Sequence, residues 1–294
     1  KMCPGEFWVL IATVLPTTAD NKTLTFESSN NKVVRTEGRK IFAVALGTAT
    51  ITCRATDGSG VTATCQVTVS PDPTLHNGHE YVDLGLPSLT RWATCNLGAD
   101  TPENTGMRFA WGDTVGYTGG HAFNEANYVH CNGSGSLLTK YCNDINYWDT
   151  STGLPMDNKL ELDPEDDAAH VWWGGDWRMP TKAEWKELVD NCDMTYLSYN
   201  KQEKIGGVVC YNGLKMTSKT TGNSIFLKES LATISDVVDD GHYWSSTLDG
   251  DSSSRFGIHF TFYLNGRIYN QHINGYSREL DGLIRPVCPK PTAE

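Results

Sequence analysis

The feature of this chain that most constrains its fold is a strictly alternating stretch in its last fifth. Phe256, Ile258, Phe260 and Phe262 occupy every second position, which is the spacing of side chains on one face of a β-strand. Asn265-Gly266 then supplies the residues that favour a tight two-residue hairpin turn. We therefore expect an antiparallel hairpin with one buried face.

The positions between these apolar residues, and those after the turn, carry varied polar and aromatic side chains. Tyr, His and Arg give a large contact area at a low entropy cost, so the exposed face is predicted to bind a ligand. A plain solvated sheet is the alternative interpretation. The predicted contact residues, which include two acids of the preceding loop, are Asp249, Asp251, His259, Thr261, Tyr263, Arg267, Tyr269, Gln271, His272, Asn274, Tyr276 and Arg278.

The register of this hairpin has two possible forms. A two-residue turn at Asn265-Gly266 pairs Tyr263 with Ile268. This pairing puts Ile268 on the same face as Tyr263, whereas an apolar side chain should face inward beside Phe262. A bulge near the turn would remove this conflict.

Charge and hydropathy exclude two classes of protein. Lys and Arg number 24 against 35 Asp and Glu, a net charge of -11, and no basic run exists, which argues against a nucleic-acid partner. No segment approaches the ~18 consecutive apolar residues of a membrane helix. Because the chain begins at Lys1 and not at Met, we expect a removed export signal or anchoring segment, and a place outside the cell or on its outer surface.

The cysteines offer one pairing that the residues themselves support. The chain has nine Cys, with no Cys-x-x-Cys and no Cys/His cluster at zinc spacing, so a structural zinc site is not expected. A three-residue loop at 58–60 would place Cys53 opposite Cys65 on neighbouring strands. A four-residue loop would shift this register by one. Two buried free thiols are the alternative to a disulfide.

Residues 1–72 are predicted to form a small β-sandwich. Short alternating segments separated by turn residues fill this region without any helical pattern; the first of them is 7–14. The runs LPTTADNKTLTFESSNNKVV and ALGTATITCRATDGSGVTATCQVTV resemble the bacterial Ig-like domain of group 2. That resemblance implies a spacer or stalk on a bacterial surface protein.

A linker with two prolines, Pro71-Asp72-Pro73-Thr74, precedes a different region at 77–289. Two helices are predicted there. Asp163 is the expected N-cap of the first, with Pro164 at its first position and Gly174-Gly175 at its end. Thr181 and Glu184 form a capping box for the second, whose apolar face is formed by Trp185, Leu188 and Val189.

Several motifs in this second region resemble the Fibrobacter succinogenes major paralogous domain. They are HEYVDLGLPSLTRWATCNLGADTPENTGMRFAWGD, WGGDWRMPTKAEWKELVDNC, GNSIFL, YWSSTL and GLIRPV. That family is abundant on Bacteroidetes-type bacteria and is related to the C-type-lectin-like fold of the formylglycine-generating-enzyme branch. The resemblance implies an α+β fold with two helices and a small antiparallel sheet, in which strand 91–96 lies near 283–288. It also allows a Cys95–Cys288 disulfide.

Some relatives of that fold carry the variable region of a diversity-generating retroelement in the corresponding stretch. The resemblance therefore implies that exposed positions within 256–278 are rewritten while the framework stays fixed. An ordinary, undiversified face is the alternative.

Catalytic and metal chemistry find little support in the sequence. Calcium could use the carboxylates of Asp236, Asp239, Asp240, Asp249 and Asp251, but their spacing fits solvated loop acids better, so no cofactor is predicted. Oxidase relatives depend on a reactive cysteine pair, whereas this chain has only Cys288 after Cys210. No Ser/His/Asp arrangement stands at a nucleophile elbow. Arg178 and Arg285 lie inside framework motifs and are predicted to be structural.

The sequence as a whole predicts an all-β Ig-like sandwich followed by an α+β C-type-lectin-like domain. The predicted role is adhesion or ligand binding at a bacterial surface, without catalysis, toward a protein or glycan on another cell, a phage or a host. An enzyme, either a carbohydrate-active hydrolase or a formylglycine-generating-type oxidase, is one alternative. A structural subunit of a surface appendage is another.

Overall fold

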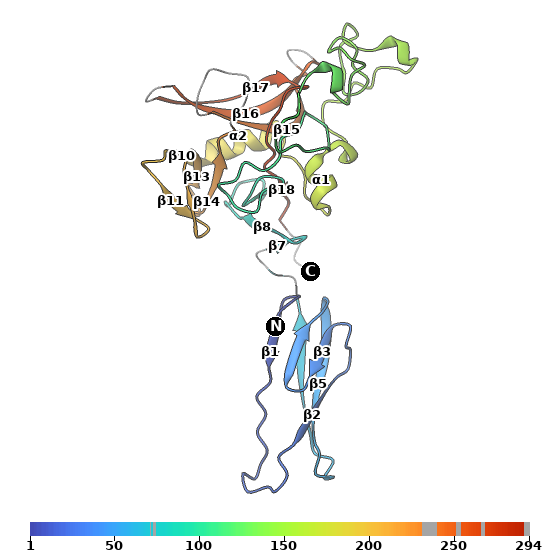
Figure 1. Ribbon diagram of the computed structural model, residues 1–294, viewed down its shortest axis with the longest axis vertical. Coiled ribbons are helices and arrows are strands. Elements are labelled where there is room, and N and C mark those ends of the chain that lie inside the picture. The colour runs from blue at the N-terminus through green and yellow to red at the C-terminus, as the bar shows by residue number, and fades with distance from the viewer. Residues whose placement is uncertain (71, 73–74, 231–239, 251–253, 266–267, 291–294) are drawn as a thin grey trace. The chain divides into compact units, whose positions relative to one another are not determined.

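The computed structural model describes residues 1–70, 72, 75–230, 240–250, 254–265 and 268–290, and of residues 263–265 and 268–270 it describes the backbone. The chain divides into two compact units, Lys1–Leu75 and His76–Glu294, and the division falls beside the proline-containing linker. Most regular structure is β-sheet, and the described residues contain two α-helices (Figure 1).

The first unit consists of two three-stranded antiparallel sheets. One has the order β1-β4-β3 and the other β2-β5-β6. Val34, Ile41, Ile51 and Val69 are buried together with Met2 in the core of this unit. The strands are β1 (Phe7–Val9), β2 (Leu24–Ser28), β3 (Val34–Glu37), β4 (Lys40–Ala43), β5 (Gly47–Ala55) and β6 (Thr62–Val69). The strand expected at 7–14 therefore ends at Val9.

The register of β5 and β6 differs from both predicted forms. Cys53 lies opposite Ala63, and Cys65 lies opposite Ile51. The cause is a longer turn, in which the Asp57 carboxylate accepts hydrogen bonds from the backbone N–H and the hydroxyl of Ser59. Both cysteines are free thiols, so the predicted Cys53–Cys65 disulfide is not formed.

The described residues of the second unit form four sheets. Their strand orders are β18-β9-β8-β7, β10-β13-β14, β11-β12 and β15-β16-β17. The strands are β7 (Leu75–His76), β8 (His79–Val82), β9 (Arg91–Ala93), β10 (Cys192–Leu197), β11 (Glu203–Ile205), β12 (Val208–Cys210), β13 (Gly213–Ser218), β14 (Ser224–Lys228), β15 (Asp240–Leu248), β16 (Phe256–Asn265), β17 (Ile268–Ser277) and β18 (Val287–Cys288). Short 3₁₀ turns occur at η1 (Glu125–Asn127), η2 (Thr150–Thr152) and η3 (Pro164–Asp166).

The two ends of the second unit pair with each other, as the second resemblance implied. Val287 in β18 lies opposite Trp92 in β9. Cys288 lies opposite Arg91 rather than Cys95, and both cysteines are free. The Cys95–Cys288 disulfide is therefore not formed in the structure.

The helix predicted from Thr181 is confirmed. Helix α2 (Lys182–Asn191) begins with a complete capping box, in which the Thr181 hydroxyl accepts from the Glu184 N–H and the Glu184 carboxylate accepts from the Thr181 N–H. Its buried face includes Trp185 and Leu188. The Trp185 ring stacks on Phe260 of β16 with 4.8 Å between ring centroids. Helix α2 thus covers the apolar face of the sheet β15-β16-β17 (Figure 1).

The helix predicted from Asp163 is wrong in its start. Asp163 makes no side-chain capping bond, and residues Pro164–Asp166 form a 3₁₀ turn. Helix α1 (Ala168–Trp173) begins only after Asp167, whose carboxylate accepts from the N–H groups of Ala169 and His170. Asp167 caps the helix instead of Asp163, because its second oxygen also accepts from the Met179 N–H. This bond fixes the Asp167 carboxylate inside the unit.

Candidate functional site

The register of the sheet β15-β16-β17 determines which side chains share its polar face. On the central strand, Thr261 lies between His242 of β15 and His272 of β17. In the next row, His259 lies between Trp244 and Asn274. Tyr276 follows opposite Gly257, so this face brings together side chains from all three strands.

The hairpin turn comes one residue later than predicted. Pairing runs without a shift from Phe256 opposite Ser277 to Asn265 opposite Ile268. The irregularity in this sheet lies instead between β15 and β16, in the part of β15 between Trp244 and Leu248. The predicted bulge near the turn is therefore not needed.

This register divides the predicted contact residues between two faces. His259, Thr261, His272, Asn274 and Tyr276 share the polar face. Gln271 lies opposite Phe262 and Tyr269 opposite Leu264, so both occupy positions on the other face, and their predicted place on the contact face is wrong. Asp236, Asp239, Asp251, Arg267 and the side chains of Tyr263 and Tyr269 lie outside the described residues.

Burial further reduces the number of predicted contact residues that are free to meet a ligand. His272 and Asn274 are exposed and Tyr276 is half-buried. His259 and Thr261 are only 3% and 8% exposed, so their predicted exposure is wrong. The Tyr276 ring explains this for His259, because its centroid lies 4.7 Å from that of His259, and Trp244 contacts both rings.

Arg278 is a framework residue, contrary to its predicted role in ligand contact. It is 1% exposed, and its guanidinium donates to the Tyr128 hydroxyl at 2.9 Å and to the backbone carbonyl oxygens of Lys140, Tyr141 and Ser254 at 2.8–3.0 Å. The group also lies 4.9 Å from the centroid of the Trp111 ring. These four hydrogen bonds hold distant loops of its own unit.

Asp249 is also enclosed by the protein. It is 6% exposed, and its carboxylate lies against Gly275, where an added Cβ would come within 2.3 Å of Oδ2. A larger residue at 275 would therefore force this carboxylate to move. Asp249 is not positioned as the contact residue that the sequence predicted.

Arg178 and Arg285 have the structural roles predicted for them. Arg285 is fully buried and donates to Asn96 Oδ1 and to three backbone carbonyl oxygens. Arg178 forms a two-pronged ion pair with Glu184 at 2.6–2.7 Å, which links the α2 capping box to the preceding strand segment.

A pair of histidines forms the centre of the polar face. His242 Nε2 lies 3.0 Å from Asp240 Oδ2, and the His242 and His259 ring centroids are 5.3 Å apart. The Nδ1 atoms of both rings are buried without a hydrogen-bond partner within the described structure. Burial, with the neighbouring His242, lowers the pKa of His259 to about 3, and burial raises the pKa of Tyr276 to about 12. Both groups are uncharged at neutral pH.

Two adjoining cavities of about 560 and 570 Å³ lie beside β15, and sequence reasoning missed them. Glu161 and Thr181 line both. The Glu161 carboxylate accepts from the hydroxyls of Ser246 and Thr247. The first cavity adds His170, Asp176 and Arg178, and the second adds Lys182, Lys186 and Ile273. Of the motifs in the sequence, Trp-Ser-Ser-Thr at 244–247 lies nearest to these cavities, because Ser246 lines one and Thr247 lines the other.

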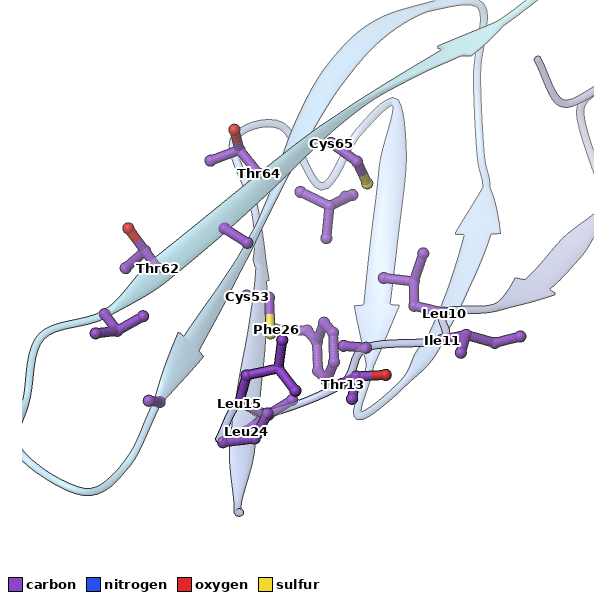
Figure 2. A pocket seen from close by; sticks show the side chains of 16 residues that line it. Leu10, Ile11, Thr13, Leu15, Leu24, Phe26, Cys53, Thr62, Thr64 and Cys65 are labelled. Carbon is purple, nitrogen blue, oxygen red and sulfur yellow. The ribbon is translucent and has the colours of Figure 1, made fainter. Parts of the chain in front are cut away.

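A further cavity of about 360 Å³ lies within the first unit, between residues 10–15 and the sheet β2-β5-β6. Figure 2 shows Leu10, Leu24, Phe26 and the thiols of Cys53 and Cys65 around it. Its wall is mostly apolar, with three threonines and two cysteines, and contains no charged side chain, so it offers space but no carboxylate, imidazole or amine.

Neither a metal cluster nor a membrane-spanning helix is found among the described residues. No group of three or more His, Cys, Asp or Glu side chains has the geometry of a metal site in the ranges that the structure covers. No helix in those ranges combines the length and hydropathy that crossing a membrane requires.

No family model matches the chain, and no curated protein matches it. The resemblances to the group 2 Ig-like domain and to the Fibrobacter succinogenes major paralogous domain therefore stay predictions.

Proposed function

We propose that the second unit is a ligand-binding module of an exported bacterial surface protein, and that the first unit is its Ig-like stalk. The observation that carries the proposal is the construction of the sheet β15-β16-β17. One face is held under α2 through Phe260 and Trp185, whereas the edge strand β17 presents His272, Asn274 and Tyr276 at alternate positions on the other face. A rigid sheet with such an edge strand supports a recognition surface.

The chemistry of this surface favours a neutral polar ligand. Asn274 offers an amide donor and acceptor, His272 an imidazole, and Tyr276 an aromatic ring with a hydroxyl. Such side chains bind sugar hydroxyls and peptide groups with little entropy cost. We therefore propose a glycan or a protein surface as the ligand, and a C-type-lectin-like scaffold as the fold that presents it.

The cysteines weigh against the oxidase alternative. Burial raises the pKa of the Cys192 and Cys210 thiols to about 11 and that of Cys288 to about 12. Burial also raises the pKa of Cys95. Nucleophilic thiols need a lowered pKa so that the thiolate forms at neutral pH, and these four thiols have the opposite environment. Binding without covalent chemistry is thus better supported.

A glycan and protein array tests this proposal with adjacent residues on opposite faces. We expect His272→Ala and Asn274→Ala to weaken binding at least about tenfold, as losses at interface hot spots do. Gln271→Ala is the matched control and should bind as the unchanged chain does, because Gln271 lies on the other face. The array is run with a chelator present. Equal loss in all three variants would contradict the proposal, as would turnover of a substrate that one Cys or carboxylate substitution abolishes.

Diversification is tested separately by sequencing the coding locus in sibling isolates. If the face is rewritten, changes will concentrate in adenine-bearing codons of 256–278 and spare the apolar positions. Changes scattered uniformly along the locus would indicate that the face is not diversified.

A further inference from the structure

Two neighbouring imidazoles on the polar face each have a buried Nδ1 atom without a hydrogen-bond partner in the part of the chain that the structure describes. His242 is anchored through Nε2, which lies 3.0 Å from Asp240 Oδ2. The His259 ring lies beside the backbone carbonyl of its cross-strand partner, Asn274. A buried polar atom without a partner is costly, so these two positions call for a bound species.

The Asp240 carboxylate fixes which nitrogen of His242 carries the proton. A carboxylate can only accept, so Nε2 of His242 is the donor and its Nδ1 exposes a lone pair. An imidazole whose remote N–H is held by a carboxylate or a backbone carbonyl is the usual arrangement of a metal-ligating histidine. His242 has this arrangement, and the neighbouring His259 is 3% exposed.

The separation of the rings fits one shared ion. Two imidazoles bound to a tetrahedral ion, with N–metal distances of about 2.0 Å, have centroids roughly 5 Å apart. The centroids of His242 and His259 are 5.3 Å apart. The Tyr276 ring packs on both, with centroid distances of 5.0 and 4.7 Å.

We propose that His242 and His259 form a two-histidine site for a late first-row transition-metal ion such as Zn²⁺, Co²⁺, Ni²⁺ or Cu²⁺. Imidazole nitrogens suit these ions, whereas calcium prefers oxygen ligands. Asp240 is a positioning residue that orients His242, and water completes the coordination. With two ligands from the protein, the ion binds more weakly than in a four-ligand structural site and exchanges with the medium.

Titration with Co²⁺ tests this site on the full, tag-free chain after removal of metals with a chelator. Co²⁺ is the probe because thiolate ligands give a strong charge-transfer absorption, which distinguishes the histidine site from the nine thiols. We expect one Co²⁺ per chain with nitrogen and oxygen ligands and no thiolate band. His242→Gln and His259→Gln should each weaken binding about 100-fold and Asp240→Asn about tenfold. His121→Gln, which changes a histidine outside this sheet, should not change Co²⁺ binding.

Several outcomes would overturn the site. The first is the absence of saturable Co²⁺ binding by the folded chain, and the second is a thiolate absorption band. The third is a Co²⁺ affinity of the His242→Gln variant equal to that of the unchanged chain. A water molecule bridging the two Nδ1 atoms in a crystal grown with Zn²⁺ would do the same. Near-UV circular dichroism checks that each variant is folded. If His259→Gln is not folded, the variants of the less buried His242 and Asp240 decide whether the metal site exists. Because the array experiment contains a chelator, failure of the metal site leaves the proposed ligand face untouched.

Discussion

His130 and His259 are buried imidazoles that the protein keeps neutral. Burial and the charge of Arg278 lower the pKa of His130 to about 4, and His130 Nε2 lies 3.0 Å from the Gly112 carbonyl oxygen. The pKa of His259 is lowered to about 3. In an unfolded chain both would titrate near their usual value of about 6.5. Protonation therefore favours the unfolded state at both positions.

These two residues predict a pH dependence of stability with a definite sign. The pKa values of both residues are lower in the folded chain than in the unfolded chain. Their contribution to the unfolding free energy is therefore fully present above pH ~6.5 and is lost as the pH falls toward about 4. Between pH 7 and 5 each should cost roughly 2 kcal/mol of unfolding free energy. Urea titrations of the second unit at pH 7, 6 and 5, with a chelator present, measure the total.

The variant His259→Gln is the control for this prediction. It should remove about half of the loss between pH 7 and 5, because Gln does not titrate. Most carboxylates titrate below this window and contribute little to it. A stability that stays level from pH 7 to 5 would contradict the prediction.

At the scale of elements, capping decides where α1 begins. Two aspartates four residues apart precede this helix, and both suit an N-cap by residue type. Asp167 alone bonds the first helical N–H groups, and it is 5% exposed. Asp163 instead pairs with Lys140 and Lys159. The two carboxylates therefore stabilise the chain by different amounts.

Asp167→Ala and Asp163→Ala form a matched pair that measures this difference. Losing the Asp167 cap and its bond to the Met179 N–H should cost about 3 kcal/mol. Losing Asp163 should cost no more than about 1 kcal/mol, since its ion pairs are partly solvated. Chemical denaturation of both variants gives the two values. A larger cost for Asp163→Ala would mean that the helix begins where the sequence alone placed it.

At the scale of the whole molecule, the two units have separate cores. The core of the first unit includes Val34 and Ile51, and the largest core of the second unit includes Trp185 and Leu214. Each unit therefore has what it needs for a folding transition of its own.

Calorimetry of the full chain should accordingly show two unfolding transitions. Ile51→Ala should lower the melting temperature of one and Leu214→Ala that of the other, each by removing about 2–5 kcal/mol of stability. Both side chains are at most 1% exposed, so the two variants control for each other. A single transition that both substitutions shift equally would contradict independent folding.

The sequence by itself determined the features that depend on near neighbours. The alternation from Phe256 to Phe262 predicted a strand with one buried face, and the Thr181–Glu184 capping box predicted the start of α2; both are found. Period and capping are short-range properties, because side chains two to four residues apart decide them. The composition change near residue 72 likewise lies beside the boundary between the units.

Only the tertiary structure decided which polar residues are free to bind. Arg278 resembles an exposed contact residue in the sequence, but it is buried by partners about 140 residues away, among them Tyr128 and Tyr141. Cross-strand register placed Gln271 on the face opposite His272 and kept Cys53 from Cys65. Such contacts join distant segments and depend on turn lengths, so no local pattern of residues can specify them.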